Sequence, residues 1–550
     1  MTDRELLRGT GQPLGPYALA ASRPHRTVLD VLRRRAADPS RPWLVFDGQD
    51  VLTYGDATVE AAAIAAAVRK DDSPYRDRVG IFMDNRREFI TSLLGITAGG
   101  GVAVPLHGRA RGHLLWSVLD DSRPELVVVG APQLALLAEL DDLPGIDQVV
   151  CVEPTDLTEA GGVPVIGFGE WLSAEDVTPF DQLRLPESHE TALIQYTSGT
   201  TGQPKGVVCS HHYLYMFSAL SADAFGWSED DVLMTPLPLY HSAALHHVAF
   251  AALHANATGH LKSRFSASSF WRQARDDGAN FVVLMGALAV MLMERGAQVD
   301  DHRVDTVFCT PPPPKIEEFE QRFGTTVAWH TYGMTEIYPA PMIGRSASND
   351  RHDSVGRPAT WVDYGIVDET GAYLGPGEVG ELVFRPAIPG MMTDGYHQRP
   401  DETARAMRGL VYHTGDLGRY DEDGWLYLVG RASDRVRRRG ENVPLAYIEH
   451  EVLATSGVTA GTVYGVPSEL GEDDIKVDVV GDVDLAVLHE RLVESLPDFM
   501  VPRYYERRTD LPLTPSARVR KDELRALGID RPGVVDMTRS LSDESQTGAR

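Results

Sequence analysis

Hydrophobic residues follow two spacings along the chain, one typical of helices and one typical of buried strands. Residues 27–37 carry apolar side chains at helical spacing. Short apolar runs, such as residues 126–129 and 148–152, are typical of parallel strands covered on both faces. Two further runs flank a turn at Asp47 and Gly48, as in a β-hairpin. Strands and helices that alternate in this way predict an α/β fold.

A change of composition near residue 434 predicts that a second, smaller domain follows a large one. Four arginines stand among residues 435–439, and a compact αβ pattern then continues to about residue 527. We therefore predict an N-terminal domain over residues 1–433 and a C-terminal domain over residues 434–527. The end of the chain is rich in Ser, Thr, Asp and Gly and poor in apolar residues, which predicts a disordered tail over residues 528–550.

The composition is that of a globular protein, but its charge is strongly acidic. The 550 residues include 52 Lys and Arg against 79 Asp and Glu, which gives a formal net charge of −27. Such a chain repels phosphate backbones, so we do not expect a nucleic-acid-binding protein.

Cysteine usage and the lengths of the apolar runs indicate a cytoplasmic protein. The three cysteines are far apart and form no C-x-x-C pair, which argues against a disulfide framework or a zinc ribbon and fits a reducing compartment. The first residues hold no apolar signal core, and no apolar run reaches the roughly 18 residues that a membrane span needs. We therefore expect a cytoplasmic protein without a transmembrane helix.

The strongest chemical signal is the segment 196–206, which reads YTSGTTGQPKG. Glycines let backbone N–H groups approach an anion closely, hydroxyls add donors, and a lysine adds a point charge, so the segment predicts a phosphate cradle. It is not the standard P-loop, because no Gly-Lys-[Ser/Thr] closes it. A flexible surface turn is the structural alternative, but a turn needs neither the lysine nor this order of residues. The candidate phosphate-binding residues are Thr197, Ser198, Gly199, Thr200, Thr201, Gly202 and Lys205.

This segment resembles the signature of the adenylate-forming superfamily, which includes acyl-CoA synthetases, peptide-synthetase adenylation domains and luciferases. Each of the other motifs is weak alone, but together they occur in the order that the family has, over nearly the whole chain. They are PLYHS at 238–242, TYGMTE at 331–336, SVGRP at 354–358, GEL at 380–382, YHTGD at 412–416, GRASD at 430–434 and RGENV at 439–443. The segment 438–443 looks most like ligases of the carnitine/crotonobetaine-CoA type.

The resemblance implies a large N-terminal α/β domain and a small, mobile α+β lid that is hinged at Asp434. It also assigns roles in nucleotide binding. Tyr332, followed by Gly333, would stack on adenine, with core packing as the alternative. Asp416 would accept the ribose hydroxyls, with a turn residue as the alternative, and Arg431 would hold the ribose or a phosphate from the other side.

Two neighbouring residues of the same motif are candidates for the phosphates and their metal. Thr335 can hydrogen-bond a phosphate or the acyl-adenylate. Glu336 is a hard oxygen ligand suited to Mg²⁺, with Thr200 as a second ligand, and a solvated surface carboxylate is the alternative for Glu336.

Histidines after the second motif are candidates for acid binding. A lone histidine in an apolar segment is more often a core residue, but the resemblance places His241 beside the acyl carboxylate, where an imidazole can orient an anion. His246 and His247 lie on the same predicted helix. They either line the acyl pocket or face solvent, and the sequence does not decide between the two.

The chain departs from the family pattern at two places. Residues 311–314 are four prolines where the family has small residues, so the pocket wall should be stiffer, with Pro312 packing adenine against Tyr332 by apolar contact. With His241, the neighbouring His330 and Thr331 suggest an acid that carries polar groups rather than a long fatty chain.

The second departure lies in the segment LTPSARVRK at 513–521. Arg518 stands where the family has the lysine that bridges the acyl carboxylate and the α-phosphate, and Ala517 replaces a glycine. An arginine keeps the charge but presents a planar fork instead of a compact ammonium. Lys521 matches the second lysine of the pattern and is the alternative source of that charge.

The predicted reaction uses ATP, Mg²⁺, a small-molecule carboxylic acid and coenzyme A. The acid is adenylated first, and a thiol then takes the acyl group, with Gly440 near the path of coenzyme A. The alternatives are an adenylating enzyme with another acceptor (a carrier thiol or an amine), an enzyme that adenylates nitrite to diazotise an aryl amine, and a degenerate nucleotide-binding protein. The sequence identifies neither the acid nor the oligomeric state.

Overall fold

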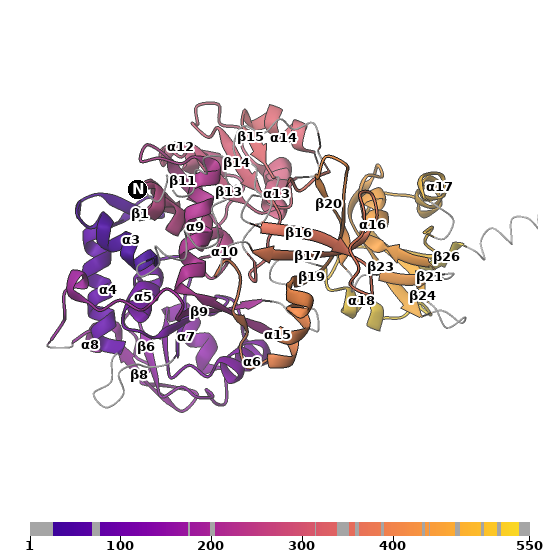
Figure 1. The fold of residues 1–550 in the computed structure, drawn as a ribbon. Helices are drawn as coiled ribbons and strands as arrows, with labels where there is room; N and C mark the ends of the chain where they lie inside the picture. The colour runs from indigo at the N-terminus through magenta and orange to yellow at the C-terminus, as the bar shows by residue number, and fades with distance from the viewer. Residues whose placement is uncertain are drawn as a thin grey trace, which may run out of the picture. The chain divides into compact units, whose positions relative to one another are not determined.

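The chain has a mixed α/β fold, as predicted, with a large N-terminal part and a smaller C-terminal part built on sheets (Figure 1). The computed structural model describes residues 26–68, 78–173, 176–197, 204–313, 315–329, 331–337, 351, 353–357, 362–386, 390–431, 435–438, 441–467, 473–496, 500–513 and 519–537. It divides into two compact units: unit 1 is Met1–Asp363 with Arg385–Arg408, and unit 2 is Tyr364–Phe384 with Gly409–Arg550. None of the described helices combines the length and hydrophobicity needed to cross a membrane.

Unit 1 contains, in its described residues, a nine-stranded sheet with the order β18-β10-β9-β4-β3-β5-β6-β8-β7. Its central strands are parallel, whereas β10 runs antiparallel to both β9 and β18. The predicted apolar runs form β5 and β6, and all four residues of β5 are buried. The strands are β3 (Arg78–Phe82), β4 (Val102–Pro105), β5 (Leu126–Val129), β6 (Gln148–Cys151), β7 (Glu159–Ala160), β8 (Val163–Gly167), β9 (Thr191–Thr197), β10 (Lys205–Ser210) and β18 (Gly395–Tyr396).

A second, seven-stranded sheet of unit 1 has the order β15-β14-β13-β11-β12-β1-β2 in the described residues. It is parallel except for β2, which forms the predicted hairpin with β1 through a turn where Asp47 and Gly48 have φ values of 50° and 74°. The strands are β1 (Pro42–Phe46), β2 (Asp50–Thr53), β11 (Val232–Thr235), β12 (Thr258–Leu261), β13 (Phe281–Leu284), β14 (Thr306–Cys309) and β15 (Thr326–Ala328).

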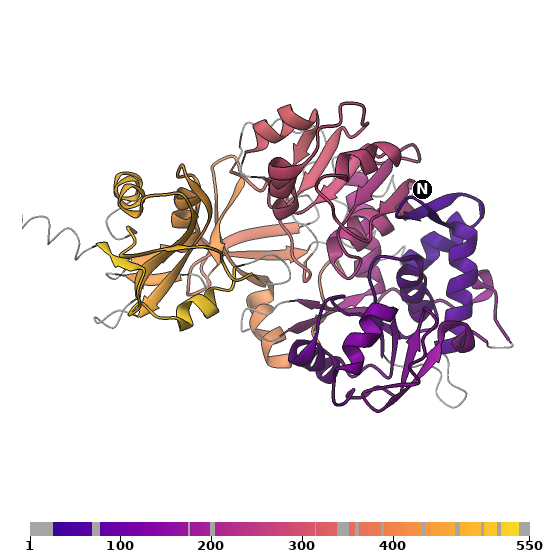
Figure 2. The ribbon, with the colours of Figure 1, turned by 180° about the vertical axis from the view of Figure 1, so that it is seen from behind.

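One hydrophobic core joins the two sheets of unit 1. Helix α9 contacts β9, β10, η2 and α11, and the ribbon of unit 1 is seen from both sides in Figures 1 and 2. Its first turn is capped by Ser210, whose hydroxyl accepts from the Tyr213 N–H. The helices are α3 (Val28–Arg35), α4 (Tyr54–Val68), α5 (Arg87–Ala98), α6 (Gly112–Ser122), α7 (Ala131–Ala138), α8 (Phe168–Trp171), η1 (Phe180–Gln182), α9 (His211–Phe225), α10 (Ser242–Ala244), the π-helix η2 (Leu245–Phe250), α11 (Ala251–Ala255), α12 (Phe270–Asp276), α13 (Gly286–Arg295), α14 (Ile316–Phe323), α15 (Pro400–Ala406) and η3 (Arg408–Leu410).

Unit 2 combines a four-stranded sheet, β16-β17-β19-β20, with a second four-stranded sheet, β23-β24-β25-β26, and a two-stranded ribbon, β21-β22, in its described residues. Helices α16 and α17 pack on the second sheet and share its core. The elements are β16 (Val362–Val367), β17 (Gly380–Pro386), β19 (Tyr412–Tyr420), β20 (Leu426–Arg431), β21 (Arg435–Arg438), β22 (Glu441–Pro444), α16 (Leu445–Leu453), β23 (Val458–Pro467), β24 (Asp473–Gly481), α17 (Leu485–Ser495), β25 (Tyr504–Arg508), α18 (Lys521–Ala526) and β26 (Val534–Asp536).

The division into units falls before the predicted domain boundary at Asp434. The sheet β16-β17-β19-β20, which the sequence assigned to the N-terminal domain, groups mostly with the C-terminal residues instead. Asp434 lies outside the described residues, so a hinge at this position stays a prediction.

The prediction of a disordered tail over residues 528–550 is wrong for residues 528–537. Residues of β26 pair antiparallel with β25, Arg503 donates to Asp536 at 2.9 Å, and Arg531 donates to Glu506 at 2.6 Å. Backbone pairing and charge pairs hold the segment, and Met537 is buried in the core of the same sheet. Residues 538–550 lie outside the described residues.

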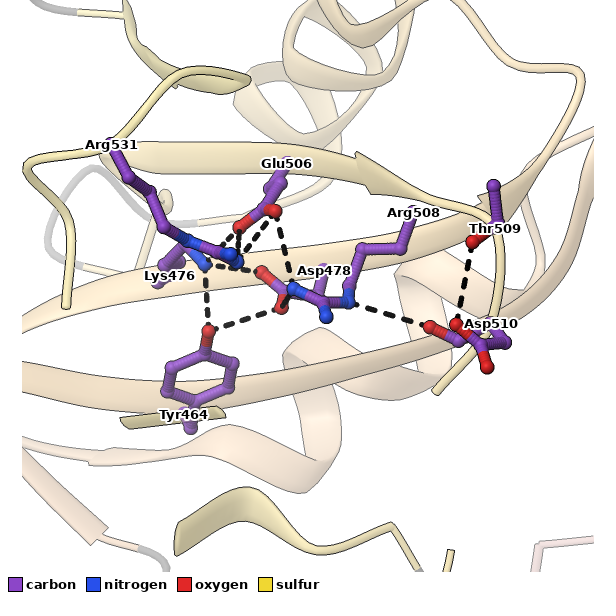
Figure 3. A network of polar contacts seen from close by, with 8 residues as sticks. All are labelled: Tyr464, Lys476, Asp478, Glu506, Arg508, Thr509, Asp510 and Arg531. Atoms are coloured by element: carbon purple, nitrogen blue, oxygen red, sulfur yellow. Dashed lines mark hydrogen bonds and ion pairs between the residues drawn. The ribbon is translucent and has the colours of Figure 1, made fainter. Parts of the chain in front are cut away.

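A network of buried charges joins the strands of the second sheet of unit 2 (Figure 3). The Lys476 ammonium lies 2.7 Å from Asp478 Oδ1 and 2.7 Å from Glu506 Oε2, and it donates to the Tyr464 hydroxyl. The side chains of Lys476 and Asp478 are fully buried. Burial raises the pKa of Asp478, and the hydrogen bond from Lys476 opposes that rise. Lys476 is the fully buried cation of this network, and Arg508 and Arg531 contact the same carboxylates from its edge.

We predict that Lys476→Met destabilises unit 2 strongly. Breaking a buried ion pair on one side typically costs about 3–5 kcal/mol, because the remaining charge stays buried without compensation. Chemical denaturation combined with hydrogen exchange of β23–β25 measures the loss. Arg507→Met is the matched control, because its pair with Asp482 on the same sheet lies at the surface and should contribute little. Equal losses in the two variants would contradict this account.

Candidate active site

The β9–β10 hairpin fixes both ends of the predicted phosphate cradle. Lys205 pairs with Thr197 across the two strands, and Gly206 pairs with Tyr196. Gly206 must be a glycine, because a Cβ there would lie 2.7 Å from Ile194 Cγ2 and 3.1 Å from Tyr196 Cζ. The residues between the two ends, which include Ser198, Gly199, Thr200, Thr201 and Gly202, lie outside the described residues.

Tyr396 connects the predicted phosphate lysine to the predicted metal ligand. The Lys205 ammonium lies 5.5 Å from the centre of the Tyr396 ring, and the Tyr396 hydroxyl donates to Glu336 Oε1 at 2.9 Å. Two residues 131 positions apart in sequence (336 − 205) therefore meet on one tyrosine. Glu336 is only 6% exposed, which excludes the alternative of a solvated surface carboxylate.

The Lys205 ammonium also forms an ion pair with Glu402 of α15. The hydrogen bond from Lys205 lowers the pKa of the Glu402 carboxyl, so Glu402 is charged at neutral pH. Arg399, at the start of the same helix, reaches Asp121 at 3.0 Å, and Asp121 also accepts from the Tyr196 hydroxyl at 2.6 Å. Sequence reasoning missed Tyr396, Glu402 and Asp121, because none of them lies in a motif with a chemical signal.

The backbone around Glu336 is held by three contacts. The Tyr213 hydroxyl donates to the Thr335 carbonyl at 3.0 Å, and the Thr393 N–H donates to the Glu336 carbonyl at 2.7 Å. Thr393 Oγ1 in turn donates to the carbonyl of Val208 in β10 at 2.7 Å. The segment that carries Glu336 is therefore tied to the strand that begins at Lys205.

The predicted adenine-binding residues differ in exposure. Tyr332 is 5% exposed, which is consistent with the alternative of core packing. Stacking of Tyr332 on adenine stays a prediction. Gly333 is exposed, Pro312 is half-buried, and Pro311 is exposed. His330 lies outside the described residues, and Thr331 is buried.

His241 is half-buried at the N-terminal end of α10, in a cluster of three rings. Its ring centre lies 4.7 Å from that of Tyr240 and 6.0 Å from that of His107. The segment is pinned by the Gln195 side chain of β9, which donates to the Tyr240 carbonyl at 2.7 Å and accepts from the Ser242 hydroxyl at 2.9 Å. Sequence reasoning missed His107 and Gln195.

His246 and His247 do not face solvent, which excludes one of the two alternatives. Both are buried in the π-helix η2, and His246 stacks on Phe217 with ring centres 4.3 Å apart. His247 Nδ1 lies 3.0 Å from the Ser221 hydroxyl, whereas neither ring nitrogen of His246 has a hydrogen-bond partner in the described part of the chain. Burial lowers the pKa of each histidine to about 3, so both are neutral at neutral pH.

Unit 2 carries the predicted ribose-binding pair. Asp416 of β19 lies opposite Arg431 of β20 in the strand register. Glu381 fixes the preceding turn, because its carboxylate accepts from the Gly415 N–H at 3.1 Å and contacts His413 Nδ1 at 2.8 Å. Asp434 and Gly440 lie outside the described residues.

The two candidates for the bridging charge have different surroundings. The Lys521 ammonium lies 2.9 Å from Glu449 Oε2 of α16, and the same carboxylate accepts from the Val463 N–H at 3.1 Å. Lys521 is therefore part of the packing of α18 within unit 2. Arg518 lies outside the described residues.

The described residues fit a site for Mg²⁺ but not one for a fully protein-coordinated metal. They contain no group of three or more His, Cys, Asp or Glu placed to bind a metal ion. Mg²⁺ usually takes one or two carboxylates and completes its shell with water and substrate phosphates. One nearly buried carboxylate, Glu336, beside the phosphate cradle meets that requirement.

Comparisons with known proteins point to one enzyme family. The family model of the AMP-binding enzymes matches residues 32–397. A crotonobetaine/carnitine–CoA ligase of Salmonella arizonae is 31% identical over 464 residues, covering 82% of this chain and 88% of that protein. One of Salmonella agona is 30% identical over 471 residues, with the same coverage.

Solved structures share the fold at lower identity. ATP-bound MatB from Rhodopseudomonas palustris matches with a TM-score of 0.79 and 23% identity, over 92% of this chain and 99% of that chain. The anthranilate CoA ligase AuaEII with anthranoyl-AMP matches with a TM-score of 0.80 and 18% identity, over 91% and 97%. The chain belongs to the AMP-binding enzyme family. The resemblance to the adenylate-forming superfamily is thus confirmed, and the protein is an ATP-dependent, AMP-forming ligase of the acid–thiol class.

We predict that Glu402→Gln tightens ATP binding. If Lys205 binds phosphate, ATP must displace the Glu402 carboxylate, and a partly exposed ion pair of this kind is worth about a two- to fivefold change in Kd. Titration calorimetry measures the Kd. Glu318→Gln is the control, because it removes an exposed ion pair with Lys315 on α14. Unchanged or weaker ATP binding in Glu402→Gln would show that Glu402 does not compete with phosphate.

Proposed function

We propose that the protein joins a carboxylic acid to coenzyme A through an acyl-adenylate. In the first half-reaction a carboxylate oxygen attacks the α-phosphorus of ATP, and the bond to the β-phosphate breaks to release pyrophosphate. In the second, the thiol sulfur of coenzyme A attacks the acyl carbon, AMP leaves as the carbon–oxygen bond breaks, and the thiol proton goes to solvent. The observation that carries this proposal is the meeting of Lys205 and Glu336 on Tyr396, beside a cradle whose two ends are fixed.

Little covalent chemistry falls to the side chains in such a reaction. Positioning and charge neutralisation supply most of the acceleration. The ATP-binding set is proposed to be Thr197, Ser198, Gly199, Thr200, Thr201, Gly202 and Lys205 for the phosphates, Tyr332, Gly333 and Pro312 for adenine, and Asp416 and Arg431 for the ribose. Thr335 would bind phosphate or the adenylate, and Glu336 with Thr200 would hold Mg²⁺, which would supply charge neutralisation at the phosphates.

The acid is proposed to be a small molecule with polar groups. His241, Tyr240 and Ser242 carry polar side chains on one half-buried segment, which suits a substrate with polar groups better than a long alkyl chain. The acids in the names of similar proteins are a reasonable starting panel: crotonobetaine, carnitine, anthranilate and o-succinylbenzoate. Coenzyme A is the proposed acceptor, because the similar proteins are named as its ligases.

A panel assay tests the proposed function. ATP, Mg²⁺ and each acid are incubated with and without coenzyme A, pyrophosphate release is recorded, and the product is identified by mass. A thioester with coenzyme A supports the proposal. An acyl-adenylate without a thioester would indicate another acceptor, such as a carrier thiol or an amine, and nitrite with an aryl amine is added as a separate arm. If the protein binds ATP but no acid of the panel causes pyrophosphate release, the result would indicate a degenerate nucleotide-binding protein.

We predict that Arg518→Ala lowers acid-dependent pyrophosphate exchange by about 10²–10³-fold. Loss of one contact to the charge that develops in a transition state typically has this effect, and a guanidinium can bind the α-phosphate and the carboxylate through separate N–H groups. Conversion of a preformed acyl-adenylate to the thioester should be spared, because the proposed lid, hinged at Asp434, turns Arg518 away in that step.

Lys521→Ala is the matched control for this prediction. Its ammonium is paired with Glu449, so the variant should lower the melting temperature more than the exchange rate. If Lys521→Ala abolishes exchange and Arg518→Ala does not, the lysine carries the bridging charge and the assignment to Arg518 is wrong.

A further inference from the structure

Two loops from different sheets of unit 1 meet at a histidine and a tyrosine. His107 follows β4 of the nine-stranded sheet, and Tyr240 follows β11 of the seven-stranded sheet. Their ring centres are 4.7 Å apart, and His107 Nε2 lies 3.4 Å from the Tyr240 hydroxyl. Tyr240 directly precedes His241, the residue that the family resemblance places at the acyl carboxylate.

The hydrogen bonds of His107 determine which nitrogen carries its proton. The backbone N–H of Arg109 donates to His107 Nδ1 at 3.2 Å, so the lone pair of Nδ1 is used as an acceptor. A neutral imidazole has one donor and one acceptor nitrogen, so the proton is on Nε2. Burial lowers the pKa of His107, which keeps the ring neutral. His107 therefore donates to the Tyr240 hydroxyl rather than accepting from it.

The Tyr240 hydroxyl is consequently left with its own proton to donate. His107 is the only hydrogen-bond partner of this hydroxyl among the described residues. Burial raises the pKa of Tyr240 to about 12, so the phenol keeps its proton at neutral pH. Gln195 holds the Tyr240 carbonyl at the other end of the residue, so the backbone and the hydroxyl are fixed independently.

One nearby cation, Arg109, acts on this hydroxyl. The exposed cation of Arg109 lies close enough to lower the pKa of both His107 and Tyr240 by charge interaction. Asp84 acts on the pKa of Tyr240 in the opposite sense, and its effect is smaller than that of Arg109. A half-buried O–H donor with a cation nearby is suited to bind a carboxylate.

We propose that Tyr240 donates a hydrogen bond to the carboxylate of the acid substrate and that His107 is the positioning residue that holds the Tyr240 hydroxyl. The inference rests on the proposed function. The resemblance assigns only His241 to the carboxylate, and the inference adds Tyr240 as a second hydrogen-bond donor and His107 as the residue that positions it. It also limits the substrate class to acids whose carboxylate can reach the half-buried segment 240–242.

Tyr240→Phe is the direct test, with the panel acid of highest kcat/KM as the probe. Loss of a hydrogen bond to a charged group should raise the KM for the acid about 10- to 100-fold. The kcat should change little, because the carboxylate is most negative before it attacks, so the contact gains nothing in the transition state. The KM for ATP should not change.

Two substitutions of His107 separate positioning from packing. In His107→Asn, Oδ1 can replace Nδ1 as the acceptor of the Arg109 N–H, but the side chain is too short to reach Tyr240, so the KM for the acid should rise. In His107→Gln, the longer amide can donate to the Tyr240 hydroxyl, so the KM should stay near that of the wild type. In the Tyr240→Phe background, His107→Asn should have no further effect on KM, because the contact that it supports is gone.

The outcomes distinguish this inference from the proposed function. If no acid of the panel makes the wild type release pyrophosphate, the proposed function fails and the inference fails with it. If the wild type is active and Tyr240→Phe has an unchanged KM for the acid, only the inference is overturned. If His107→Asn and His107→Gln are equally impaired, or if His107→Asn and Tyr240→Phe act additively, His107 is a packing residue and its positioning role is wrong.

Discussion

The position of strand β10 between β9 and β18 is the constraint on which the candidate site depends. Its pairing with β9 places Lys205 opposite Thr197, and its pairing with β18 places Val207 opposite Tyr396. A shift of register by one residue would turn the Lys205 side chain to the opposite face of the sheet. The same strand accepts the hydrogen bond from Thr393, whose N–H fixes the Glu336 carbonyl. The proposed phosphate lysine and the proposed metal-binding carboxylate are thus both tied by hydrogen bonds to the same strand.

The cations near this strand are already paired with carboxylates. Lys205 is paired with Glu402, and Arg399 is paired with both Glu402 and Asp121. In a chain with a net charge of −27, such pairs keep partly buried cations compensated before any nucleotide binds. If Lys205 binds phosphate as proposed, ATP enters by exchange, because its phosphate must replace the Glu402 carboxylate at Lys205. The free energy gained by phosphate binding at Lys205 would therefore be the difference between the free energies of the Lys205–phosphate and Lys205–Glu402 ion pairs.

The sequence predicted the parts of the site that are local in the chain. Continuous apolar runs identified β5 and β6, whereas the roles that the motifs assign to the cradle and to Glu336 stay predictions. Tyr396 was not predictable, because β18 has only two residues and is defined as a strand only by its pairing with β10, almost 200 positions earlier in the chain. The tail was misjudged for a similar reason: Asp536 is held by Arg503, next to β25, and Arg531 by Glu506 of β25, and these pairs are visible only in the fold. Lys521 matched a motif, but its pairing with Glu449 is visible only in the fold.

Neutral and charged side chains are distributed unequally between the two proposed halves of the site. Around the segment 238–250, His107, His246, His247 and Tyr240 are all uncharged at neutral pH, because burial shifts each pKa toward the neutral form. The cations Lys205 and Arg399 lie near strand β10, whereas Arg109 is the cation that acts on Tyr240. A carboxylate that is held by neutral donors keeps more of its electron density than one in a tight ion pair, and adenylation needs that density for attack on phosphorus. The unequal distribution therefore suits a nucleophile on one side and an electrophile on the other, which is what the proposed first half-reaction requires.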